Sequence, residues 1–176
     1  MIELSQTPMT TPDTASSKRS RLPSLGPRGE GWVAIQGVLI VAIVACGVFG
    51  PRWPEAARLW LWIAAAVIGL AGLALFAGGS QRLGRQLTPF PKPVADGDIK
   101  RDGAFRLVRH PIYGGVLLVA LAWALASSPW ALVPWVLACV FLDLKRRREE
   151  AWLCEHNPAY ADYLSEVRRQ FFPFVW

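Results

Sequence analysis

Three long stretches of the chain carry no Asp, Glu, Lys or Arg, and they dominate its pattern of apolar and polar positions. They cover residues 32–50, 59–77 and 111–142. The first two contain 19 residues each, which as α-helix would reach roughly 28 Å, close to the hydrocarbon thickness of a bilayer. A water-soluble helix of that length would show a polar face, and neither stretch has one. The pattern predicts transmembrane helices.

The third apolar stretch is too long for one crossing and is interrupted near its middle. Two serines and a proline at residues 127–129 are typical of the tip of a helical hairpin. The arms would cover residues 111–126 and 130–144, and because both are short for a span we expect tilt or local thinning of the bilayer. The alternative is one long kinked helix, which would move the C-terminus to the other side of the membrane.

The placement of the 19 basic residues favours the hairpin. Four precede the first span, two lie within residues 51–58, seven within residues 82–109, none at residues 127–129 and six from Lys145 onward. The positive-inside rule then predicts four spans in the cell (inner) membrane, with both termini in the cytoplasm. Topology and contact with anionic head groups account for the net charge of +6. The expected partner is therefore the lipid bilayer and no nucleic acid.

These features place the chain in the all-α class, as a polytopic membrane protein of about four transmembrane helices in two hairpins with a cytoplasmic helical C-terminal tail. Residues 1–30 contain few large apolar side chains, so we expect a disordered N-terminal tail. Residues 31–77 would form the first transmembrane hairpin, and residues 78–176 a second membrane domain ending in the tail. We expect two tail helices separated at Asn157-Pro158. The second span carries small residues suited to close helix packing, namely Ala65, Ala66, Gly69 and Gly72.

The three cysteines have no spacing typical of disulfides or of a metal site. Cys46 and Cys139 fall within predicted spans and Cys154 within the tail, where each is expected to act as a small buried hydrophobe. Residues 43–46 look like a lipoprotein cleavage box. Because the apolar run continues past Cys46 to Gly50, we expect no cleavage there. From the spacing of the cysteines we predict no metal ligands.

The stretch richest in chemistry begins at Gly103 and contains an Arg-His-Pro sequence at residues 109–111. Pro111 suits the first turn of a helix, which would put Arg109 and His110 at a helix N-terminus on the cytoplasmic edge of the membrane. That terminus offers unpaired N–H groups and partial positive charge, both suited to an anion, and Arg109 adds a planar bidentate donor. The alternative is an ordinary helix cap in which Arg109 reaches a lipid phosphate.

A second polar group, Glu149 and Glu150, follows the last predicted span. Because the arms of a hairpin end side by side, these carboxylates should lie near Arg109 and His110. Adjacent residues on a helix point about 100° apart, so at most one of the two is expected to face inward, and the residues alone do not decide which. A solvated charge cluster and an ion pair with Arg109 are the alternatives.

Several short motifs follow one another in order along the second half of the chain. They are the loop 84–93, Gly103, the run Arg109-His110-Pro111-Ile112-Tyr113-Gly114, Glu149-Glu150 with Leu153, Tyr160 with Tyr163, and Phe172-Pro173. The ordered set resembles bacterial-type members of the isoprenylcysteine carboxyl methyltransferase family and the related phospholipid methyltransferases, over roughly residues 84–176. Two positions depart from the family pattern, because Phe105 stands where a tyrosine is usual and Asn157-Pro158 stands where a glycine is often found.

The resemblance implies a membrane-embedded methyltransferase that uses S-adenosylmethionine and has no dinucleotide-binding domain; no Gly-x-Gly-x-x-Gly motif occurs here. It implies a cofactor pocket formed by the last two spans and the tail, and a lipophilic or small-molecule methyl acceptor bearing a carboxylate, amine or thiol. Catalytic roles would fall on Arg109 and Glu150. Cofactor contacts would come from His110, Pro111, Tyr113, Gly114, Glu149, Tyr160 and Tyr163.

A different class of function is a non-catalytic membrane assembly or regulatory subunit, in which Arg109 and the two glutamates form structural ion pairs. A transporter is less expected, because the three apolar stretches contain no charges and show no paired broken helices. Substitutions distinguish the two leading interpretations. In a cofactor-binding protein, His110→Ala or Glu150→Gln should weaken ligand binding in folded protein, whereas in a scaffold they should impair folding or change nothing.

Overall fold

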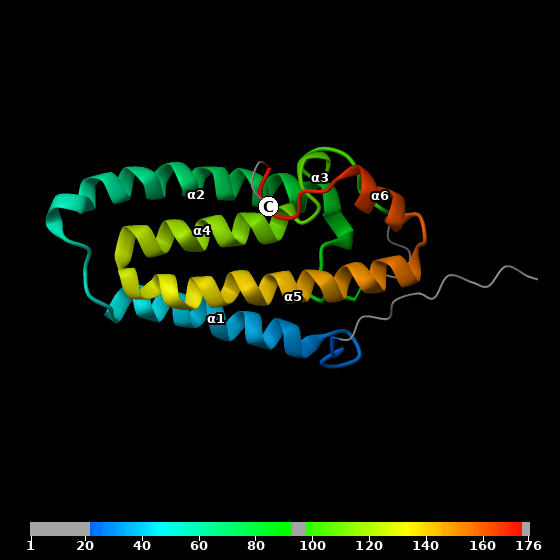
Figure 1. Ribbon diagram of the computed structural model, residues 1–176, viewed down its shortest axis with the longest axis horizontal. Helices are drawn as coiled ribbons and strands as arrows, with labels where there is room; N and C mark the ends of the chain where they lie inside the picture. The colour runs from blue at the N-terminus through cyan, green and yellow to red at the C-terminus, as the bar shows by residue number, and fades with distance from the viewer. Residues whose placement is uncertain (1–21, 93–97, 174–176) are drawn as a thin grey trace, which may run out of the picture.

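The computed structural model describes residues 22–92 and 98–173, and within these residues it contains helices and no strands (Figure 1). Residues 1–21, which make up most of the predicted disordered tail, and residues 174–176 lie outside the described part. The helices are α1 Glu30–Phe49, α2 Glu55–Leu83, η1 Gly84–Gln86, α3 Ala104–Leu107, α4 Pro111–Ser127, η2 Pro129–Ala131, α5 Leu132–His156 and α6 Tyr160–Glu166.

The four long helices lie side by side, with α4 and α5 between α2 and α1 (Figure 1). The expectation that the first two helices pack as a hairpin is therefore wrong. Residues 50–54 join α1 to α2, but within the described residues the two helices do not touch each other. Instead α2 packs along α4, and α1 packs along α5. The second helix also continues six residues past the predicted end of its span at Ala77, to Leu83.

Glycines on α2 allow its close approach to α4. A Cβ atom added at Gly72 would lie 2.8 Å from Leu118 Cβ, and one added at Gly79 would lie 2.9 Å from Pro111 Cγ. Real Cβ atoms do not make contacts this short, so both positions require glycine. The small-residue face predicted on the second span does serve close packing, and its partner is α4.

The predicted hairpin at residues 127–129 is confirmed, which excludes the single kinked helix. Helix α4 ends at Ser127, and the Ser128 hydroxyl accepts a hydrogen bond from the backbone N–H of Trp130 at 3.2 Å. The last carbonyls of a helix have no partner within it. Here the indole N–H groups of Trp53 and Trp62 donate to the carbonyls of Ala124 and Ala126, each at 3.1 Å.

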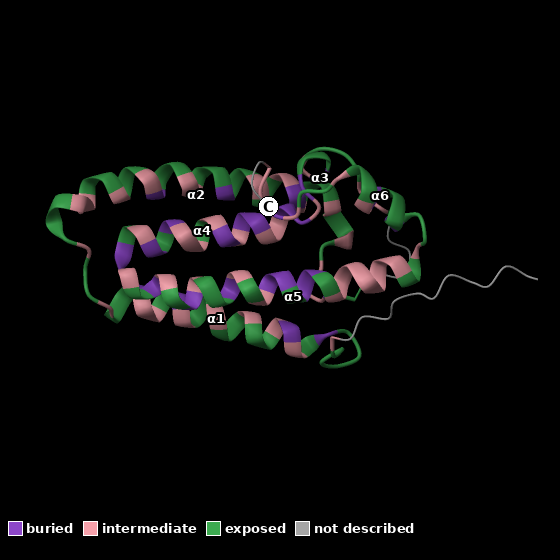
Figure 2. Cartoon of the chain, viewed as in Figure 1, coloured by how far each residue is buried: buried purple, intermediate pink, exposed green. Residues whose placement is uncertain are grey.

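Within the described residues, two helices are long and apolar enough to cross a membrane, namely α1 and the helix formed by α2 with η1. Only 17% and 11% of the residues in their most apolar windows are buried in the protein, and Figure 2 shows both helices exposed along much of their length. Val38 is 69% exposed and Leu70 is 68% exposed. An exposed apolar surface of this kind is typical of a site that contacts a membrane or another protein. The α4 helix is also apolar and is shorter than these two.

The tail has the predicted break, because α5 ends at His156 and α6 begins at Tyr160. The first tail helix is, however, a continuation of the last apolar arm, since α5 runs without interruption from Leu132. After α6 the chain turns back and lies against the start of α4 (Figure 1). The polar end of the bundle thus gathers the end of α2, the start of α4, the end of α5, and α3 with α6.

Candidate active site

The residues that lead into α4 are not helical. Val108 is extended, with a φ of −145°, and His110 has a φ of −125° and a ψ of 64°. Pro111 occupies the first turn of α4 as predicted. The N–H groups of Arg109 and His110 donate to the carbonyls of Arg169 and Gln170 at 3.0 and 2.9 Å. This pairing brings the C-terminal segment to the start of α4, and it occupies two of the N–H groups expected to be available for an anion.

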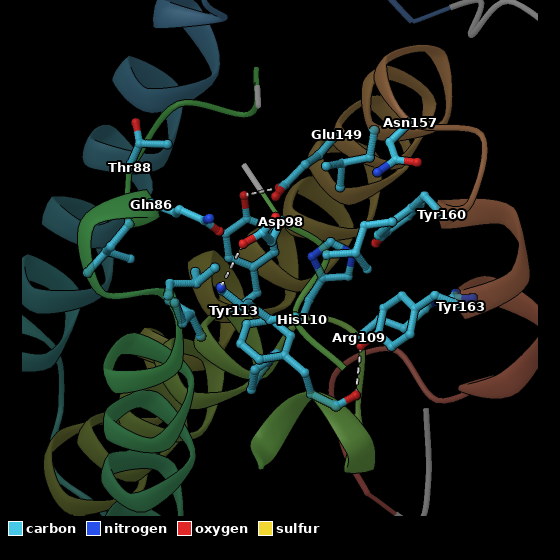
Figure 3. A pocket seen from close by; sticks show the side chains of 18 of the residues that line it. Gln86, Thr88, Asp98, Arg109, His110, Tyr113, Glu149, Asn157, Tyr160 and Tyr163 are labelled. Atoms are coloured by element: carbon cyan, nitrogen blue, oxygen red, sulfur yellow. Dashed lines mark hydrogen bonds and ion pairs between the residues drawn. The ribbon is translucent and has the colours of Figure 1, made fainter. Parts of the chain in front are cut away.

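A pocket with a cavity of about 160 Å³ opens at this end of the bundle (Figure 3). Its walls come from five regions of the chain, namely the end of α2 with the following loop, α3, the start of α4, the end of α5, and α6. Of the nine site residues predicted from the sequence, seven line it, and these are Arg109, His110, Pro111, Tyr113, Glu149, Tyr160 and Tyr163.

The other two predicted site residues, Gly114 and Glu150, do not line the pocket. A Cβ atom added at Gly114 would collide with the carbonyl oxygen of Phe171. This glycine therefore admits the backbone of the C-terminal segment to the surface of α4. Its role in the structure is close packing of two parts of the protein.

The two adjacent glutamates have different environments, because they point in different directions from α5. Glu149 lines the pocket and accepts a hydrogen bond of 2.6 Å from the Tyr113 hydroxyl (Figure 3). Glu150 lies behind the wall, with a side chain that is 12% exposed. The expectation that at most one of the two faces inward is wrong, because both carboxylates contact the start of α4; of the two, Glu149 lines the pocket.

Glu150 is the centre of a buried ionic network. Its Oε1 atom lies 3.0 Å from His110 Nε2 and 3.1 Å from Arg109 Nε, although the Arg109 N–H is not aligned for a hydrogen bond. Its Oε2 atom accepts a 2.8 Å bond from Arg146 Nη1. Burial alone would raise the pKa of Glu150, but the hydrogen bond from His110 and the charges of its neighbours outweigh that effect and lower it. Glu150 is therefore ionised and positions His110 and Arg109.

Asp143 and Arg146 extend this network along α5, and sequence reasoning missed both. Asp143 Oδ1 lies 2.7 Å from Arg146 Nη2, and its Oδ2 lies 2.7 Å from Arg147 Nε. The spacing 143, 146, 147 and 150 is the i, i+3, i+4, i+7 pattern of one helix face. That periodicity would have identified a charged stripe continuing from the apolar arm into the tail.

The tyrosines of α6 close the far side of the pocket. Tyr163 is 1% exposed, and its hydroxyl donates to the backbone carbonyl of Phe105 at 2.7 Å. The acceptor is a main-chain atom, so the bond would form with any side chain at position 105. The departure at Phe105, where the family that the sequence resembles usually has tyrosine, therefore leaves this contact intact. Burial raises the pKa of both Tyr160 and Tyr163, so their phenols stay neutral and supply ring faces and O–H groups.

The loop after α2 supplies a wall that the sequence did not assign residue by residue. Gln86, Thr88, Phe90 and Asp98 line the pocket. Phe90 is held in place locally, since its N–H donates to the Thr88 hydroxyl at 3.2 Å. No group of three His, Cys, Asp or Glu side chains in the described parts of the chain could hold a metal ion.

The pocket is chemically mixed, with an apolar side and a polar side. The apolar side chains Leu83, Ile112 and Leu153 face a polar set that includes the cation of Arg109 and the carboxylate of Glu149. A zwitterionic ligand with an aromatic ring fits this donor set, because a cation is available for an acid, a carboxylate for an ammonium, and tyrosine rings for stacking.

Comparison with known proteins gives one partial similarity. No protein-family profile matches the chain. The chain is similar to the delta(14)-sterol reductase of Mus musculus, with 32% identity over 89 residues, or 48% of this chain and 21% of that protein. The chain therefore matches about a fifth of the length of this curated relative.

Proposed function

We propose that the protein is a membrane-embedded enzyme that transfers a methyl group from S-adenosylmethionine to a lipophilic or small acceptor at the cytoplasmic face of the membrane. The observation that carries the proposal is the convergence of the Arg109–Tyr113 motif, Glu149 and the two α6 tyrosines on one pocket. These are separate in sequence, and the resemblance to membrane methyltransferases assigned them to one cofactor site.

The pocket residues match the chemical groups of this cofactor. Arg109 would bind its carboxylate, Glu149 would accept from its ammonium or hydroxyl groups, and the rings of Tyr113, Tyr160 and Tyr163 would cover its adenine. When bound, S-adenosylmethionine supplies an electrophilic methyl group on a sulfonium. The protein then has to align an acceptor with that carbon and exclude water. An acceptor carboxylate needs no base, whereas His110 is placed to receive a proton from an amine or a thiol.

The position of the pocket supports a lipophilic acceptor. Leu83 and Ile112 form part of its wall at the point where α2 and α4 leave the apolar zone. A polar cofactor would enter from water, and an apolar acceptor would enter from the lipid side. The similar Mus musculus protein is by name an enzyme that acts on a sterol, which supports a membrane enzyme with a lipophilic substrate.

The name of that relative favours a second candidate, a reductase of a lipophilic substrate. A reductase needs a hydride donor, and a nicotinamide dinucleotide carries several phosphates. Among the lining residues in the described part of the chain, Lys100 and Arg109 are the only Lys or Arg side chains. This small positive charge fits one carboxylate better than a row of phosphates.

Isothermal titration of the detergent-purified protein with S-adenosylhomocysteine, and separately with a reduced nicotinamide dinucleotide, tests the proposal. Saturable binding of the first ligand only, weakened at least tenfold in Glu149→Gln as expected for a lost charged hydrogen bond, would support methyl transfer. Binding of the dinucleotide only would favour the reductase. If the folded protein binds neither ligand, the function that remains is that of a non-catalytic membrane subunit. The Arg109–Glu150 ion pair is the feature expected of such a subunit.

A further inference from the structure

Lys145 is 1% exposed, and the hydrogen bonds of its ammonium go to neutral groups. Its Nζ atom donates to Gln36 Oε1 at 2.6 Å and to the carbonyl of Pro89 at 3.0 Å. The same ammonium lies 5.1 Å from the centre of the Tyr113 ring. Lys145 on α5 therefore touches α1, the loop after α2, and α4. The proposed binding of S-adenosylmethionine gives it no role.

Two of these contacts are with parts of the pocket. Pro89 belongs to residues 87–92, here named the rim segment, in which Leu87, Thr88 and Phe90 line the pocket. Tyr113 is the residue whose hydroxyl donates to Glu149. Lys145 itself does not line the pocket. Its ammonium thus lies behind the pocket wall and contacts two parts of it, the rim segment and Tyr113.

The start of α1 supports the other end of the rim segment. Pro91 is fully buried, and a Cβ atom at Gly29 would lie 2.5 Å from Pro91 Cγ. Gly29 has a φ of +84°, a conformation that favours glycine. The segment is therefore held by Lys145 at Pro89 and by the turn before α1 at Pro91. Outside these contacts it contains no regular structure that could fix its position.

We propose that Lys145 is a positioning residue that holds the rim segment and Tyr113 in the arrangement that forms the pocket, with α1 taking part through Gln36. Helix α1 supplies no residue to the pocket walls, and this connection gives it an influence on the site. The effect on ligand affinity rests on the proposed function, whereas the effect on the order of the rim segment does not.

The test compares Lys145→Met with Lys92→Met, which removes an exposed lysine of the rim segment. Hydrogen exchange of the intact protein in detergent should be about tenfold faster at residues 84–92 in Lys145→Met, because a charged hydrogen bond to Pro89 is lost. Exchange in α1, α4 and α5 should stay unchanged. Methionine keeps the apolar stem, and because relief of the buried charge offsets part of the two lost hydrogen bonds, the melting temperature should change little. Lys92→Met should match the wild type throughout.

A purely structural lysine would behave differently, lowering the melting temperature and accelerating exchange in α1 and α5 as well. That result, or unchanged exchange at residues 84–92, would overturn the proposal. If Lys145→Met does not fold, Gln36→Met provides the same comparison, with a smaller local increase expected. S-adenosylhomocysteine should bind about tenfold more weakly to Lys145→Met. If Lys145→Met shows faster exchange at residues 84–92 but the wild type binds no S-adenosylhomocysteine, the positioning role of Lys145 is retained. The proposed cofactor is then ruled out.

Discussion

His110 Nε2 lies 3.0 Å from Glu150 Oε1, and this contact joins the start of α4 to the end of α5 across 40 positions of the chain. His110 lines the pocket, whereas Glu150 does not. The histidine thus presents one ring edge to the ionic network and its ring to the pocket, where it stacks on Tyr113 with 8° between the planes. The hydrogen bond to Glu150 behind the pocket wall therefore helps to set the orientation of the His110 ring in that wall.

The two adjacent glutamates should respond differently to the same substitution. Glu150→Gln leaves the buried guanidinium groups of Arg109 and Arg146 without their shared carboxylate, which should destabilise the protein by about 3 kcal/mol. Glu149→Gln keeps an oxygen for the Tyr113 hydroxyl and should cost no more than about 1 kcal/mol. Thermal unfolding in detergent, with both variants side by side, measures the difference. Equal losses of stability would contradict the assignment of Glu149 to the wall and Glu150 to the network.

Acid should destabilise the protein partly through Glu150. Its pKa in the folded protein lies below the ordinary value of 4.5, so the folded state binds this proton less readily than the unfolded state does. The associated stability is fully present above pH 4.5 and is lost as the pH falls through the folded-state pKa. Melting temperatures of the wild type should therefore drop more steeply below pH 4.5 than those of Glu150→Gln. Parallel curves would show that Glu150 is not stabilised as a carboxylate.

Gly114→Ala should detach the C-terminal segment from α4. The added Cβ would collide with the carbonyl oxygen of Phe171, and overpacking of this kind costs about 1–3 kcal/mol. The matched control is Gly37→Ala in α1, where a Cβ would meet nothing within 4 Å and the higher helix propensity of alanine should stabilise the helix by up to about 1 kcal/mol. Limited proteolysis after Arg168 and Arg169 measures release of the segment. Resistance equal to that of Gly37→Ala would contradict the prediction.

Features that depend on neighbouring residues were predictable from the sequence. The hairpin tip at residues 127–129 and the break at Asn157-Pro158 follow from proline and small polar residues acting locally. The meeting of Arg109 and His110 with the glutamates followed from the hairpin, because its two ends must be close. The roles assigned to these residues in binding and catalysis stay predictions.

Features that depend on the packing of whole helices were not predictable. A span that is apolar on every side has no face that identifies its neighbour, so nothing in the sequence indicated that α1 would pack on α5 and α2 on α4. The rotation of α5, which puts Glu149 rather than Glu150 in the wall, depends on the same packing. Lys145 gave no signal because its partners, Gln36 and Pro89, are neutral and 109 and 56 positions away.

The arrangement of the loops predicts that α4 and α5 cross the membrane together with α1 and α2. A Cβ atom at Gly50, in the turn after α1, would lie 3.2 Å from Ser128 Cβ at the hairpin tip. If α1 and α2 cross, the turn between them lies on the side opposite the pocket, and the tip must lie there too. A single cysteine at the tip should therefore be accessible from outside the cell, and one beside the pocket should not.

Trp130 is 62% exposed next to the tip, so Trp130→Cys is the informative variant in a background with Cys46, Cys139 and Cys154 replaced by alanine. A maleimide that does not cross membranes should label Trp130→Cys in intact cells. It should label Arg106→Cys, on exposed α3 near the pocket, only after the cells are permeabilised. Labelling of Trp130→Cys only after permeabilisation would contradict four spans. Labelling of Arg106→Cys in intact cells would contradict a cytoplasmic pocket, and with it access to cytosolic S-adenosylmethionine.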